Sequence, residues 1–189
     1  MRSLLLAALL AAAPASAQRF GVTGGANFAT FDDARTANFE TSTGYHVGAF
    51  AGVSVGTLGV RGGVLYLHAG DASFVCPDGR VCGAVRREVA VDVVSVPVDF
   101  QLRLPLAVGA VYAGAGPDLR FPLNDGAPVF DTNSVNVAAT GLVGAEFSNV
   151  FLELRYAHDV TGYAREIGAI DSAPDYKLNT FMVRAGIGI

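Results

Sequence analysis

The sequence predicts an all-β fold, an eight-stranded antiparallel transmembrane β-barrel of the up-and-down meander type that follows a cleaved signal peptide. Three observations support this expectation. The first 17 residues have the pattern of an export signal, apolar and polar residues alternate in later segments, and short links between these segments alternate with long ones. Alternation with this rhythm of links is typical of small barrels that cross a membrane with strands.

Residues 1–17 are expected to be the signal peptide. Arg2 supplies a positive charge, residues 4–13 form an unbroken apolar run of ten, and Ala15-Ser16-Ala17 offers the small residues that a signal peptidase recognises. Such a run is too short for a membrane-spanning helix, which takes roughly 20 residues. We therefore expect cleavage after Ala17 and a single barrel domain over residues 18–189.

The composition of the chain argues against binding to nucleic acid and favours a lipid environment. Its 13 Lys and Arg residues against 17 Asp and Glu give a net charge of −4, which provides no basic surface for nucleic acid. The chain is 51% hydrophobic, yet no later apolar stretch is long enough for a membrane helix. An apolar residue at every second position instead supplies the outer face of a barrel in lipid. Outer-membrane lipid is therefore the expected environment.

Eight segments are expected to be strands because apolar residues recur in them with a period of two. They cover residues 19–29, 43–56, 58–69, 88–104, 106–119, 136–147, 150–163 and 177–189. In the second segment, Tyr45 and Val47 lie on one face and His46 lies on the other.

The links near residues 57, 105 and 148–149 are one to three residues long, whereas the other links between predicted strands are longer and polar. This predicts short periplasmic turns and longer outer loops. An open sheet edge is not viable in lipid, so the last segment is expected to pair antiparallel with the first. Pro97 removes one ladder donor and is expected at a bulge or an edge of the pairing.

Charged residues within the strands indicate which face is inside. Arg or Lys at a lipid-facing midplane position costs about 2–4 kcal/mol, so these side chains are expected to point into the lumen and pair there. The expected network comprises Arg61, Asp99, Arg103, Glu146, Glu153, Arg155 and Arg184. Because side chains just fill an eight-stranded barrel, structural filling is favoured over an ion-conducting path.

Cys76 and Cys82 flank the turn-forming residues Pro77-Asp78-Gly79. In an exported protein they are expected to form a disulfide. The alternatives are a redox role or a metal site, but two thiols without a neighbouring histidine are half a zinc ligand set.

Five segments carry motifs that occur together in one family. They are RFGVTGGANFATF (19–31), TGYHVGAFAGV (43–53), VVSVPVDFQLRL (93–104), YAGAGP (112–117) and LELRYAHDVTG (152–162). In this order they resemble the Bacteroidota-type outer-membrane β-barrel domain family, the PorT-like small barrels of the porin family. The resemblance implies an eight-stranded outer-membrane barrel without implying one activity. A few members are linked to secretion machinery, so it also implies a secretion or surface partner.

Catalysis is not expected. His46 shares a face with Ser54, but eight residues along a strand span about 26 Å, far beyond the reach of a nucleophile and its base. Nothing in the sequence places a serine beside His158 and Asp159. There is no twelve-residue calcium loop and no phosphate-binding glycine motif between a strand and a helix. No catalytic residue, metal or cofactor is therefore expected. The predicted function is that of a monomeric integral outer-membrane barrel with a structural or interaction role through its surface loops. The alternatives are a narrow pore for small solutes and a soluble periplasmic calyx, which would need an apolar lumen and a polar outside.

Overall fold

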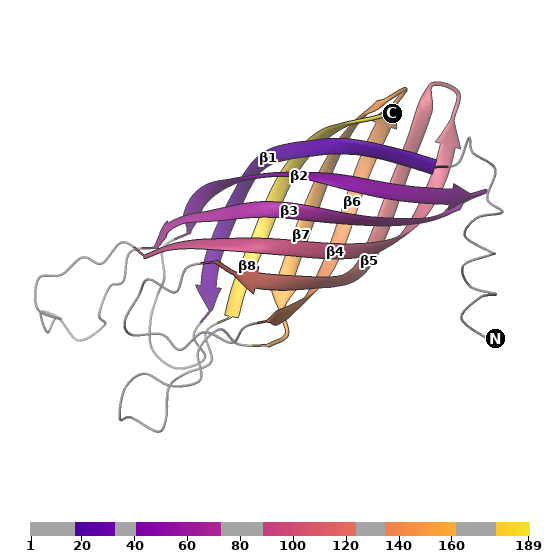
Figure 1. The fold of residues 1–189 in the computed structure, drawn as a ribbon. Helices are drawn as coiled ribbons and strands as arrows, with labels where there is room; N and C mark the ends of the chain where they lie inside the picture. Colours follow the sequence, from indigo (N-terminus) through magenta and orange to yellow (C-terminus); the bar gives the residue numbers. More distant parts are fainter. Residues whose placement is uncertain (1–17, 33–40, 73–88, 124–134, 162–176) are drawn as a thin grey trace, which may run out of the picture.

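The computed structural model describes residues 18–32, 41–72, 89–123, 135–161 and 177–189. These residues form a closed barrel in which each strand pairs antiparallel with the next and β8 pairs with β1 (Figure 1). The strands are β1 (Gln18–Asp32), β2 (Ser42–Val55), β3 (Leu58–Ala72), β4 (Val89–Leu106), β5 (Gly109–Pro122), β6 (Asn136–Phe147), β7 (Val150–Asp159) and β8 (Lys177–Gly188). The predicted fold class is confirmed. No helix among the described residues is long and apolar enough to span a membrane.

Two-residue turns join β2 to β3, β4 to β5 and β6 to β7. The first turn depends on Gly56, whose φ of 60° is accessible to glycine without steric cost. The third places Ser148 at a φ of 53°, and it is the one non-glycine residue with positive φ in the described segments. The three turns lie at the end of the barrel where β1 begins and β8 ends (Figure 1). We call this the short-turn end.

The closing pair has a continuous register. Gly21 is opposite Gly188, and the pairing continues without a shift to Asp32 opposite Lys177. The predicted pairing of the last strand with the first is confirmed. Several predicted boundaries differ. β1, β3 and β5 end three residues later than predicted, the turn near residue 105 lies at 107–108, and β7 ends at Asp159 rather than at 163. Pro105 lies within the β4–β5 pairing, opposite Ala110. A proline has no N–H to donate, but its carbonyl oxygen can still accept a hydrogen bond, so it is tolerated at this position.

The bulge predicted at Pro97 is absent, although the β3–β4 pairing is interrupted there, since Val96 and Pro97 have no paired residue in β3. A closed barrel has no edge, and the β3–β4 register is the same on both sides of this residue, with Gly62 opposite Val98 and Leu65 opposite Ser95. On its other side Pro97 is opposite Asp118 of β5. The register shift in β3 lies between His68 and Asp71, where Gly70 has a φ of 81°. The missing donor at Pro97 is therefore absorbed without a bulge.

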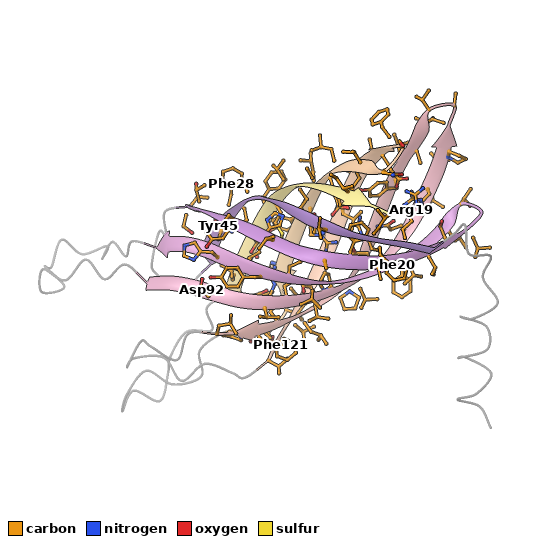
Figure 2. All side chains as sticks on the ribbon, turned by 45° about the horizontal axis from the view of Figure 1, so that its top comes forward. Arg19, Phe20, Phe28, Tyr45, Asp92 and Phe121 are labelled. Atoms are coloured by element: carbon orange, nitrogen blue, oxygen red, sulfur yellow. The ribbon has the colours of Figure 1, made fainter. Side chains whose placement is uncertain are left out.

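The two faces of the wall differ as the alternation predicted. Large apolar side chains are exposed on the outside, among them Val22, Val47, Phe100, Leu102, Leu104, Leu152, Leu154 and Ile187. Aromatic side chains lie toward both ends of the outer wall (Figure 2): Phe20 at the short-turn end, and Phe28, Tyr45 and Phe121 toward the other. Aromatic girdles of this kind flank the apolar band of membrane barrels.

Inward-facing glycines make room for inward-facing rings. A Cβ at Gly144 would lie 2.5 Å from Cζ of Tyr112, and one at Gly186 would lie 2.3 Å from Cε1 of Phe151. These rings lie over the opposite backbone, and the absence of a side chain there allows them to fill the lumen.

Gly144→Ala is expected to lower the free energy of unfolding by about 1–3 kcal/mol, because the new methyl group overlaps the Tyr112 ring. Gly141→Ala in the same strand is the matched control, since a Cβ there meets nothing within 4 Å. Urea unfolding of both variants in phospholipid vesicles measures the difference. Equal losses in the two variants would show that the ring does not occupy this position.

Candidate functional site: the charged lumen

The charged side chains of the lumen form three layers along the barrel. The middle layer holds Arg61, Asp99, Glu153, Arg155 and Arg184, each at most 8% exposed. The layer at the short-turn end holds Arg19, Arg103 and Glu146. The layer toward the opposite end holds Asp118, Arg120 and Asp159, each at most 1% exposed.

Glu153 is the centre of the middle layer. Its carboxylate accepts hydrogen bonds from three arginines: Arg61, Arg184 at 3.0 Å and Arg155 at 3.4 Å. Asp99 accepts from Arg155 and, at 3.4 Å, from Arg61. These residues come from four strands, so their ion pairs connect β3, β4, β7 and β8 across the interior.

Arg61 is also enclosed by aromatic rings. Its guanidinium carbon lies 5.9 Å from the ring centre of Phe50, 5.7 Å from that of Tyr112 and 5.4 Å from that of Phe151. Phe50 and Phe151 meet edge to face at 5.3 Å, and the Tyr112 hydroxyl donates to Glu153 at 3.1 Å. Cations over aromatic faces are favourable in desolvated sites. Rings and ion pairs together fill this cross-section.

The layer at the short-turn end centres on Glu146. Arg103 donates to its Oε2 at 2.5 Å, and Arg19 pairs with its Oε1. Arg103 also lies 5.3 Å from the Tyr112 ring centre. Because Tyr112 contacts both Arg61 and Arg103, it links this layer to the middle one.

The opposite layer centres on Arg120, which donates to Asp118 at 3.2 Å and to Asp159 at 2.9 Å. Ser95 donates to Asp118 at 2.6 Å, and the backbone N–H of Leu178 donates to Asp159 at 3.2 Å. Asp118, Arg120 and Asp159 were not predicted from the sequence to lie in the lumen. Asp118 and Arg120 alternate in step with Tyr112, and Asp159 with Glu153, so the same period of two would have assigned them to the lumen.

The structure places all seven residues of the expected network in the lumen, but not in one cluster. Arg61, Asp99, Glu153, Arg155 and Arg184 share ion pairs, whereas Glu146 pairs with Arg103 and with Arg19. Arg19 was not predicted to belong to this network, and it lies at the start of β1. Cys76 and Cys82 lie outside the described residues.

The three histidines occupy separate environments. His46 is buried in the lumen at 2% exposure. His68 lies on the outer wall, where its Nδ1 is 2.7 Å from Asp92, and His158 is 2.6 Å from Asn179. Within the described segments no histidine is hydrogen-bonded to a serine or cysteine, and no three potential metal ligands are grouped.

Comparison with known proteins identifies the family. Residues 3–188 match the family model described as outer membrane protein beta-barrel domain. The chain belongs to this family. No curated protein matches it at a significant level. Among solved structures it is similar to Neisserial surface protein A, with 13% identity over 89% of this chain and 96% of that one, at a TM-score of 0.52. It is also similar to OprG of Pseudomonas aeruginosa, with 10% identity over 92% and 96% of the chains, at a TM-score of 0.54.

As a member of this outer-membrane family, the protein is an integral outer-membrane barrel whose apolar outer wall lies in lipid. The alternative of a soluble periplasmic calyx is wrong, because that barrel needs an apolar lumen and a polar outside. Here buried arginines and carboxylates face inward, and exposed Val, Leu and Phe side chains face outward.

Glu153→Gln is expected to lower the free energy of unfolding by about 3–5 kcal/mol, because Arg184 then loses its ion pair and Arg61 and Arg155 are left to share Asp99. Adding Arg184→Met removes one uncompensated charge and is expected to recover part of the loss. A double-mutant cycle measured by urea unfolding gives the coupling between the two residues. Strictly additive losses would contradict the direct ion pair.

Proposed function

We propose that the protein is a closed, monomeric outer-membrane barrel that anchors its long connecting segments at the cell surface, where they contact a surface or secretion partner. The observation that carries this proposal is the filled lumen. Three layers of ion pairs and a cluster of aromatic rings occupy the interior between the two ends. A barrel of this kind supplies a rigid mount and leaves the connecting segments to vary.

The four long segments all leave the barrel at the end opposite the short turns. They comprise residues 33–41, 73–88, 123–135 and 160–176, as the strand bounds define them. In outer-membrane barrels the longer connections face outward and the short turns face the periplasm. A partner at the cell surface therefore meets these segments first.

Several features of the sequence support the same role. Residues 1–17 act as a signal peptide that is cleaved after Ala17, and a disulfide between Cys76 and Cys82 constrains the second long segment. The resemblance of five motifs to PorT-like barrels favours a partner in secretion machinery. The scattered histidines favour a protein that is not an enzyme.

The second candidate function is a narrow pore, and the polar character of the lumen favours it. Conduction requires a continuous path for water, whereas Arg61 is enclosed by three rings and paired with two carboxylates in the middle of the barrel. A small solute would have to displace these contacts, so the closed barrel is the better supported function.

A variant in which short turns replace the four long segments tests the proposal. We expect the variant and the natural chain to insert equally into the outer membrane and both to give a closed baseline in planar bilayers, because the obstruction lies in the barrel. The chain has one lysine, Lys177, at the start of β8 beside the long segments, and the variant keeps it. Cross-linking from intact cells through Lys177 with a membrane-impermeant amine-reactive reagent should join the natural chain to a partner and should fail with the variant.

Two results would contradict the proposal. Steady single-channel conductance from the natural chain would identify a pore. Unchanged cross-linking through Lys177 in the variant would show that the partner contacts the barrel wall instead of the long segments.

A further inference from the structure

The half of the lumen nearer the short-turn end carries an excess of positive charge. Among the described residues, its two layers contain five arginines and three carboxylates, a formal net charge of +2. The arginines are Arg19, Arg61, Arg103, Arg155 and Arg184, and the carboxylates are Asp99, Glu146 and Glu153. Uncompensated charge within a low-dielectric wall is unfavourable. This half of the lumen therefore favours a bound anion.

A pocket opens at the same end. It has a volume of about 40 Å³, room for roughly three water molecules. Its polar lining comes from Arg19, Arg61, Gln101, Arg103, Glu146 and Asn149. The Arg19 side chain is 44% exposed, so it reaches the aqueous side, whereas that of Arg103 is 15% exposed and lies deeper. A small ligand can thus enter without crossing the filled layers above.

Gln101 supplies a donor that lacks an acceptor. The residue is 5% exposed, its Oε1 accepts from Arg103 at 3.2 Å, and its Nε2 has no hydrogen-bond partner. Both oxygens of the neighbouring Glu146 are already paired with arginines. Buried polar groups nearly always have partners, so the pocket lacks an acceptor at this point.

We infer that the pocket binds a small oxyanion, such as inorganic phosphate, from the periplasmic side. Gln101 Nε2 donates to one of its oxygens, and the guanidinium groups of Arg19 and Arg103 balance its charge. Charge-assisted hydrogen bonds from arginine suit oxyanions because the planar guanidinium presents paired donors. The pocket is too small for a bulky ligand, and the inference does not depend on the identity of the surface partner.

Thermal unfolding of the purified chain in a non-ionic detergent tests the site. Sodium phosphate is titrated at constant ionic strength set with sodium chloride, and a sodium acetate series compares a carboxylate with a phosphate. A saturable rise in the unfolding midpoint with phosphate is expected. Acetate is expected to act at higher concentration than phosphate, because it brings less charge and fewer acceptor oxygens.

Gln101→Met separates binding from folding. Without phosphate this variant should have about the same stability as the natural chain, because the removal of an unpartnered buried donor offsets the loss of the hydrogen bond from Arg103. With phosphate its response should weaken about tenfold or more. Asn136→Leu is the matched control, since it removes another buried amide with an unpartnered Nδ2 in β6, outside the pocket, and should keep the full response.

Arg19→Gln provides a second variant at a more exposed position, and it should also weaken the response about tenfold. The inference is overturned if phosphate and chloride act equally at the same ionic strength, because that result reflects screening alone. It is also overturned if Gln101→Met and Arg19→Gln respond as strongly as Asn136→Leu.

Discussion

The fold depends on one constraint, which is that every backbone N–H and C=O within the lipid must find a partner inside the protein. A membrane offers no water to an open sheet edge, so the chain has to return β8 to β1. Twelve successive residue pairs, from Gly21–Gly188 to Asp32–Lys177, complete the closure. Once the wall is closed, the period of two along each strand divides the side chains into those that face lipid and those that face the lumen.

Closure also determines the character of the interior. The lumen of an eight-stranded barrel admits side chains and little else, and it receives arginines that the outer wall could not accommodate. Their charges are paired with Asp99, Glu146, Glu153 and other carboxylates, and glycines opposite Tyr112 and Phe151 leave space for the rings. The arginines near the short-turn end outnumber the carboxylates that neutralise them, and this excess of positive charge is the basis for assigning an oxyanion site to the pocket there.

The sequence predicted the strand count, the closing pair and the inward direction of the charged residues, because all three follow from periodicity and from the absence of water in the membrane. It did not predict which charges meet. Arg103 and Arg61 lie on the same face of neighbouring strands, yet Arg103 pairs with Glu146 and Arg61 with Glu153. That choice depends on the register between strands, which local alternation does not specify. The bulge predicted at Pro97 is absent because the lost donor only interrupts the pairing with β3 and leaves its register unchanged.

The central claim is that the apolar face of each strand lies in lipid and the charged face lies in the lumen. The chain contains no tryptophan, so single substitutions at adjacent positions of β7 report on the two faces. Leu152 is 58% exposed on the outer wall and Phe151 is 5% exposed in the lumen. In vesicles of brominated phospholipid, Leu152→Trp should be strongly quenched and Phe151→Trp should not. Quenching of Phe151→Trp with Leu152→Trp unaffected, or equal quenching of both, would contradict this assignment of the faces.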